Sequence, residues 1–84
     1  MHYDVIEVKP AGPLRLAVRF ADGLQGEVEF RPTHLHGVFA PLKDPNVFAQ
    51  VRCNEGFVSW PDGTDLAPDA MHAAIRERGR WVLE

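Results

Sequence analysis

Alternating hydrophobic and polar residues predict a β-hairpin over Leu14–Phe30. In its first half, apolar side chains occupy every second position, with arginine or alanine between them. Successive side chains of a strand point to opposite faces, so this period of two is typical of a strand with one buried face. The Asp22-Gly23 pair supplies the turn, because glycine readily adopts the left-handed backbone that a tight hairpin needs.

A three-residue loop over Ala21–Gly23 sets the register of this hairpin. It places Leu16 opposite Val28 on the buried face and Arg15 opposite Glu29 on the exposed face. Apolar residues then face apolar residues and each charge faces the opposite charge, whereas a shift of one residue would break both matches. We therefore expect the rest of the fold to be built around this hairpin.

Shorter patterns predict the remaining strands, turns and one short helix. A strand is expected over His2–Lys9, where Ile6 interrupts the alternation and allows a bulge. A turn over Pro10–Pro13 is expected next, and after the central hairpin a helical turn over Thr33–Gly37, capped by Gly37, and a buried crossing segment over Val38–Leu42. A short helix is then expected from Pro45, with Asp44 as its cap. A second hairpin over Val51–Trp60, turning at Glu55-Gly56, and a brief return to the sheet at Asp65-Leu66 complete the pattern.

The clearest helix is predicted over Pro68–Gly79. A proline suits its first turn, and the final glycine can end it. Met71, Ala74 and Ile75 fall on one stripe, which is expected to cover the sheet, while Arg80–Glu84 either packs back on the core or projects from it. Together the elements predict an α+β fold, in which a small, mostly antiparallel sheet built on the central hairpin is packed by the C-terminal helix and one short helix.

Composition narrows the class of protein. A chain of 84 residues is expected to form one domain, residues 1–84, and a hydrophobic content of 45% allows a core without disulfides. The formal net charge of −3 disfavours generic phosphate binding. The single cysteine, Cys53, fits a reducing compartment, and no run approaches the roughly 20 apolar residues of a membrane helix. We therefore expect a cytoplasmic protein that does not span a membrane.

Few residues suggest catalysis or metal binding. His34 and His36 come nearest to a metal motif, but a structural zinc site needs four ligands, so loop histidines are the simpler interpretation. Cys53 is a candidate nucleophile with His72 or His34 as its base, but a strand cysteine buried among apolar residues is the preferred interpretation. We expect no catalytic, cofactor or metal site.

Two surfaces are candidates for binding a partner. Trp81 lies beside Arg78 and Arg80 in the sequence, and tryptophan with arginine is favoured at protein interfaces. The second candidate is an acidic set that serves either as an electrostatic partner surface or as turn and cap residues: Glu55, Asp62, Asp65 and Asp69.

The order of several motifs resembles the domain of unknown function 2442 family, over roughly Tyr3 to Ile75. The motifs are Asp22-Gly23, Val38-Phe39 with Leu42, Asp44-Pro45 with Phe48, Gly56 with Trp60-Pro61 and Gly63, and Asp65-Leu66 leading into a helix. The chain departs from the family at Ala67, where relatives often place a polar helix cap. The resemblance implies an α+β domain from a bacterial cytoplasm, gene neighbourhood with a small partner as in toxin–antitoxin pairs, and no assigned biochemical activity.

We therefore expect a non-enzymatic protein-binding or regulatory module, antitoxin-like towards a small neighbouring protein. The alternatives are a nucleic-acid-associated regulator acting through Arg76–Arg80 and a small metal-dependent enzyme. Some longer relatives append a helix-turn-helix, and this chain ends before such a module, so direct nucleic-acid binding is not expected. A homodimer remains open, through an exposed edge such as the strand His2–Lys9.

Overall fold

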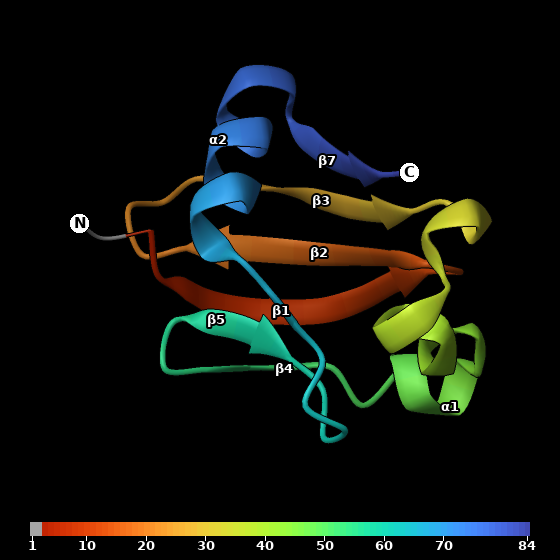
Figure 1. Ribbon diagram of the computed structural model, residues 1–84. Coiled ribbons are helices and arrows are strands. Elements are labelled where there is room, and N and C mark those ends of the chain that lie inside the picture. The colour runs from red at the N-terminus through yellow and green to blue at the C-terminus, as the bar shows by residue number, and fades with distance from the viewer. Residues whose placement is uncertain (1–2) are drawn as a thin grey trace.

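The computed structural model describes residues 3–84 and has an α+β architecture with two small sheets (Figure 1). Its elements are β1 (Val5–Gly12), β2 (Arg15–Phe20), β3 (Gln25–Phe30), the 3-10 helices η1 (Pro32–His34) and η2 (Gly37–Lys43), α1 (Pro45–Phe48), β4 (Arg52–Asn54), β5 (Phe57–Ser59), β6 (Asp65–Leu66), α2 (Pro68–Arg78) and β7 (Arg80–Leu83). One sheet has the order β1-β2-β3-β7 and the other the order β4-β5-β6. The predicted fold class is confirmed.

The central hairpin of β2 and β3 has the predicted register. Leu16 pairs with Val28, and Arg15 pairs with Glu29. Gly23 has a φ of 94°, the left-handed conformation expected at the turn. Local pairing therefore forms as the hydrophobic pattern requires.

Strand β1 is shifted towards the C-terminus relative to its prediction. The expected strand over His2–Lys9 begins at Val5, and His2 lies outside the described residues. The expected turn over Pro10–Pro13 is wrong in its bounds, because β1 continues to Gly12 and the turn lies at residues 13–14. A proline is tolerated there because β1 is at an edge of its sheet, where a missing N–H can leave the ladder intact. The register shifts at Ile6, where a bulge was predicted.

The C-terminal strand adds a parallel pairing that the sequence left open. In β7, Trp81 lies beside Val28 and Leu83 beside Phe30 of β3. The long connection between the two strands ends in α2, which packs close to β3 and β7 (Figure 1). Gly26 permits this approach, since a Cβ at that position would lie 2.5 Å from the Cγ2 atom of Ile75.

Helix α2 begins and ends as predicted. Gly79 follows it with a φ of 81°, and its N–H donates to the Ile75 carbonyl oxygen at 2.7 Å. Met71 and Ile75 are buried, as their stripe predicts, and Ala74 is half-buried. His72 is buried as well, which the stripe did not include.

The segment between the two sheets is helical rather than extended. The predicted helical turn over Thr33–Gly37 is wrong in its bounds, because η1 ends at His34 and Gly37 begins η2 with a φ of 59°. Within η2, Leu42 is buried but Pro41 is exposed, so only part of the expected crossing segment reaches the core.

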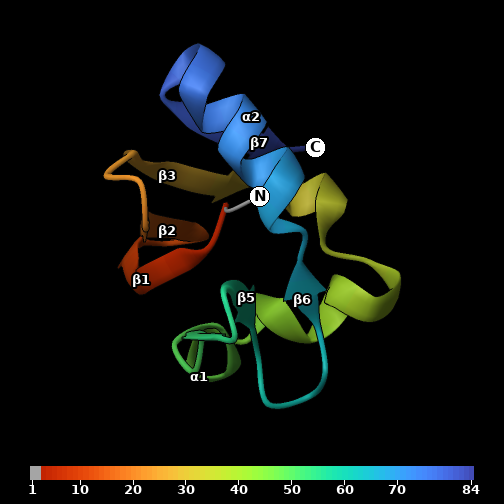
Figure 2. The same ribbon diagram turned by 90° about the vertical axis from the view of Figure 1, so that its left-hand side faces the viewer.

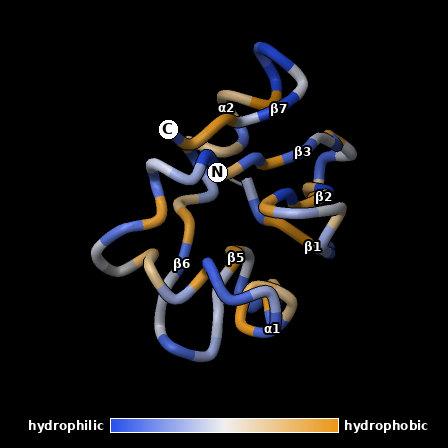
Figure 3. The backbone as a smooth tube through the Cα atoms, turned by 90° about the vertical axis from the view of Figure 1, so that its right-hand side faces the viewer, coloured by the Kyte–Doolittle hydropathy of each residue, from blue (hydrophilic) through white to orange (hydrophobic). Residues whose placement is uncertain are grey.

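The second sheet lies next to β1 of the first (Figure 2), and α1 lies beside η2 at one end of the strands (Figure 1). Trp60 is 1% exposed, and its Nε1–H donates to the Phe48 carbonyl oxygen at 3.1 Å, which links the end of β5 to α1. Phe30 packs edge-on against Phe48 with ring centroids 5.7 Å apart. Hydrophobic and hydrophilic stretches alternate along the chain, as Figure 3 shows, and the buried residues of both sheets form one core.

Candidate functional site

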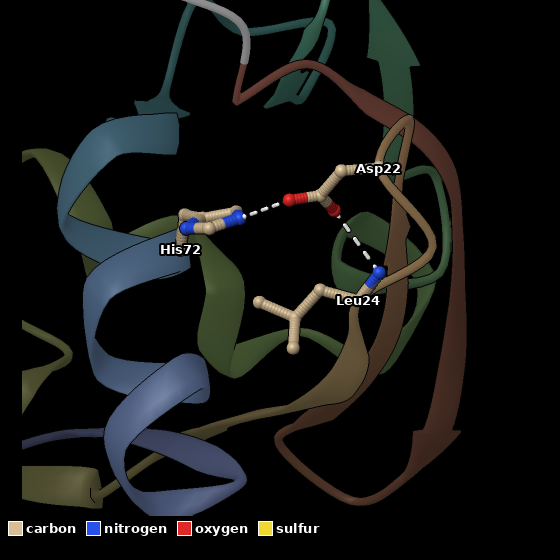
Figure 4. A network of polar contacts seen from close by, with 3 residues as sticks. All are labelled: Asp22, Leu24 and His72. Atoms are coloured by element: carbon tan, nitrogen blue, oxygen red, sulfur yellow. Dashed lines mark hydrogen bonds and ion pairs between the residues drawn. The ribbon is translucent and has the colours of Figure 1, made fainter.

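A buried histidine and an exposed turn aspartate form a hydrogen bond between α2 and the central hairpin (Figure 4). The Nε2 atom of His72 lies 2.7 Å from Oδ2 of Asp22. An ionised carboxylate only accepts hydrogen bonds, so the imidazole donates from Nε2. The other carboxylate oxygen of Asp22 accepts from the Leu24 backbone N–H at 3.0 Å, which holds the side chain in the turn.

These two bonds change the acidity of Asp22. The Leu24 backbone N–H, first, and the His72 hydrogen bond, second, lower the pKa of the Asp22 carboxyl below its ordinary value of 3.8. Hydrogen bonds to the charged form of a carboxyl favour ionisation. Asp22 is therefore a fixed negative charge at the N-terminal half of α2.

Aromatic rings enclose the imidazole of His72. Its side chain is 7% exposed. The Tyr3 ring lies over it with centroids 4.3 Å apart, and the Phe20 ring meets it edge-on at 4.8 Å. Arg76, one helical turn further on, lines two shallow hollows together with His72. The described residues that line these hollows include no serine, threonine or cysteine, and the phenol of Tyr3 carries the one hydroxyl group among them. The arrangement can therefore position a proton.

Sequence reasoning named His72 only as a base for Cys53 and gave Asp22 only a turn role. The structure pairs the two with each other instead. His72 directly follows the buried Met71 and precedes the buried Ile75 by three positions, a spacing that places it near the same helix face. That spacing was the available signal for its burial.

The predicted partner residues at the C-terminal end come together in the structure. Arg78, Arg80 and Trp81 line one groove between α2 and β7, with a volume of about 700 Å³. Alanine side chains of α2 form its other wall: Ala70, Ala73 and Ala74. Both arginines are exposed, and Trp81 is half-buried, packing against the core with one part open to the groove.

The predicted acidic surface is divided. Glu55 lies in the β4–β5 turn with a φ of 56°. Asp62 follows the other end of β5, and Asp65 of β6 pairs with Ser59 at that end. Both aspartates line a hollow with Phe39. The Asp62 carboxylate accepts from the Thr64 N–H at 2.9 Å, as its turn role predicts. The acidic set therefore does not form one continuous face.

The histidine and cysteine candidates lie apart from this pair. The Nδ1–H of His36 donates to the Thr33 carbonyl oxygen at 3.0 Å, and the His34 ring packs on Phe39 at 4.7 Å. Cys53 is half-buried against the core. Within residues 3–84, no three or more His, Cys, Asp or Glu side chains gather closely enough to hold a metal ion.

An apolar groove that the sequence did not predict lies at the end of the central hairpin. Its volume is about 570 Å³. Prolines, other apolar side chains and one glycine line it, together with Lys43: Pro10, Gly12, Pro13, Leu14, Pro32, Leu35, Leu42, Pro45, Phe48 and Ala49. Four of the lining residues are prolines that lie in or next to β1, η1 and α1, but only the folded chain brings them to one place.

Comparison with known proteins identifies a family but no characterised relative. No curated protein and no solved structure gives a significant match. In the part of the chain that the structure describes, no helix is long and apolar enough to cross a membrane. The family described as Protein of unknown function (DUF2442) matches residues 5–77, and the chain belongs to that family.

Proposed function

We propose that this chain is a non-enzymatic protein-binding module, which holds an apolar segment of a small neighbouring protein in the groove lined by Pro10, Pro13, Leu35 and Phe48. The toxin–antitoxin arrangement implied by the family resemblance fits this role, with the present chain as the antitoxin-like member. The observation that carries the proposal is the groove itself. Concave apolar surfaces of a few hundred cubic ångströms are where proteins bury ligand side chains.

The wall of the groove suits apolar side chains rather than a partner's backbone. Prolines have no N–H to donate, so the four that line it offer a partner carbonyl no hydrogen bond. Their rings also fix the local backbone, which reduces the conformational entropy lost on binding. The partner segment is therefore expected to insert two or three apolar side chains.

A charged residue at the rim of the groove would orient the partner segment. Among the described residues that line the groove, Lys43 alone is charged. An acidic residue beside the apolar anchor of the partner would face it, and such rim contacts contribute more to the rate of association than to affinity. The partner segment that fits best is apolar with a flanking carboxylate.

Co-expression with the product of the adjacent small open reading frame tests the proposal. We expect the two proteins to co-elute in size-exclusion chromatography, with a defined stoichiometry by light scattering. Ala49→Glu places a charge in the groove from an exposed position and is expected to weaken the complex about tenfold or more. Ala40→Glu is the matched control, because Ala40 is exposed and lies outside that groove.

Two results would contradict the proposal. One is separate elution of the two proteins. The other is a complex that Ala49→Glu and Ala40→Glu weaken equally, since a general charge effect would then explain the loss.

A further inference from the structure

The outer edge of β7 is open for further pairing. β7 is the last strand of its sheet, and no other strand among residues 3–84 pairs with its outer side. The Leu83 carbonyl oxygen accepts from the Arg31 N–H of the segment that continues β3, so Leu83 points its backbone groups inward. Because backbone groups of successive residues alternate between the two edges of a strand, the N–H and C=O of Arg80 and Val82 point outward.

The edge strand is short and begins with the charged Arg80, but it lacks the other usual protection. Natural edge strands are often blocked by proline, a bulge or a covering element. The segment Arg80–Leu83 has no proline or glycine, and its pairing with β3 proceeds without a register shift. Its central residues are apolar and only half-buried.

The same segment is complementary to itself when it is read in the opposite direction. If two copies pair antiparallel about Val82, Arg80 of each copy faces Glu84 of the other, and Trp81 faces Leu83. Opposite charges then lie on one face of the new pair, and an aromatic residue meets an aliphatic one on the other face. The hydroxyl of Thr33 donates to the Glu84 carbonyl oxygen at 3.2 Å, which holds the residue after β7 near the end of β3.

We propose that a second copy of this chain binds along β7 in this antiparallel register, so that the two four-stranded sheets become one continuous sheet. Two hydrogen bonds between the outward backbone groups of Val82 and its counterpart centre the interface on a two-fold axis. This proposal is independent of the apolar groove, because the groove and β7 share no residue.

The groove beside α2 accommodates the added strand. Trp81 and Leu83 lie on the core face of the sheet, next to Val28 and Phe30. In the paired strand these two side chains point to that same face and meet the groove walled by the alanines of α2. The occupant therefore needs an apolar face towards α2 and a charged pattern on the other face, and the chain's own Arg80–Glu84 segment has both.

Charge exchange tests the register. In an Arg80→Glu homodimer, a carboxylate at position 80 of each copy faces the Glu84 carboxylate of the other copy. In a Glu84→Arg homodimer, two guanidinium groups face each other at the same two places. Each single variant is expected to weaken the dimer about tenfold, by sedimentation equilibrium of the purified chain. When the two single variants are mixed, every pair is complementary again, so a heterodimer is expected to form with about wild-type affinity. The double variant Arg80→Glu/Glu84→Arg is expected to recover the homodimer.

Val82→Pro tests the backbone bonds. Its N–H points outward, so proline removes a donor from the interface without removing a bond to β3. We expect a monomer of 9.4 kDa with an unchanged circular dichroism spectrum. Arg52→Glu changes another exposed arginine on a strand, β4, and is the matched control for Arg80→Glu. It should leave the dimer unaffected.

Three results would overturn the proposal. A wild-type chain that stays monomeric at every concentration would do so, and so would a dimer that neither single charge variant weakens. A mixture of the two single variants that fails to associate would show that the losses came from the fold of each chain rather than from the register.

Discussion

The two edges of the four-stranded sheet differ in how they are protected. At β1 the second sheet lies alongside, and the Val5 N–H donates to the Gly56 carbonyl oxygen at 2.8 Å. β1 also contains Pro10 and two register shifts. β7 has none of these features. Unprotected edges pair readily with other chains. The difference between the two edges therefore supports the proposal that association occurs along β7 rather than along β1. The sequence had suggested the first strand as a dimer edge, which stays a prediction, and our proposal places the interface at the last strand.

The largest effect on stability is expected from disturbing the close packing of α2 on β3, which supports β7. A Cβ added by Gly26→Ala would lie 2.5 Å from Ile75 Cγ2 and 2.7 Å from the Gly79 carbonyl oxygen, so α2 must move away from β3. Overpacking of this kind costs about 2 kcal/mol. We expect that loss in the free energy of unfolding measured with urea, together with weaker association along β7.

Gln25→Ala provides the control on the same strand. Gln25 is exposed, and its truncation is expected to change the free energy of unfolding by no more than about 0.5 kcal/mol. Equal stability of Gly26→Ala and the wild type would mean that the close approach of α2 to β3 does not hold in solution.

The features that the sequence predicts well are local. The β2–β3 register follows from side-chain alternation and one Asp22-Gly23 turn, and α2 follows from a proline, a glycine and a hydrophobic stripe. The parallel pairing of Trp81 with Val28 leaves no such signal, because no turn connects the two strands and the intervening segment folds as a second sheet. The Asp22–His72 bond spans 50 positions for the same reason.

Part of the candidate surface was also within reach of the sequence. The composition around Trp81 indicated an interface, and the structure places that residue in a groove beside the open edge. The apolar groove was missed because its walls come from three separated segments, so that no window of the sequence shows an apolar patch. Glu55 and Asp62 appeared to be one acidic set, but they lie at opposite ends of β5. Proximity in sequence is a poor guide when a strand separates two turns.

A smaller effect on stability is expected from disturbing the contact between the second sheet and the start of β1. Gly56 has a φ of 88°, and a Cβ there would lie 2.6 Å from Oδ1 of Asp4. Gly56→Ala is therefore expected to lower the free energy of unfolding by about 1 kcal/mol, chiefly through the left-handed backbone, because the exposed Asp4 side chain can rotate away. Thermal unfolding measures the loss.

The double variant Asp4→Ala/Gly56→Ala separates the two causes. It removes the steric contact and keeps the strained backbone, so most of the loss should persist. Association along β7 is expected to remain at wild-type affinity in both variants. If Gly56→Ala abolished the dimer while the chain stayed folded, the covered edge rather than the open one would be the interface, and the comparison of the two edges would be reversed.

The smallest effect on stability is expected from weakening the Asp22–His72 hydrogen bond, which holds α2 on the central hairpin. The groove beside β7 depends on the same helix. The pKa of Asp22 is lowered by the Leu24 N–H and by His72. A carboxyl with a depressed pKa contributes stability above its unfolded value, here 3.8, and loses that contribution as the pH falls through the lower folded value. Asp22→Asn keeps an acceptor for the Leu24 N–H but carries no charge.

We therefore expect the urea midpoint of Asp22→Asn to lie below that of the wild type at neutral pH. This gap in urea midpoint between the variant and the wild type should have its full size above pH 3.8 and should shrink as the pH falls further. Asp65→Asn, which removes one carboxylate from β6, controls for the change in net charge. A gap that stayed constant into strong acid would show that the charge of Asp22 contributes nothing, and that the turn and α2 are held by packing alone. A gap that closes on acidification would instead show that the charge of Asp22 stabilises the fold through the Leu24 N–H and His72 together, and so contributes to holding α2 beside β7.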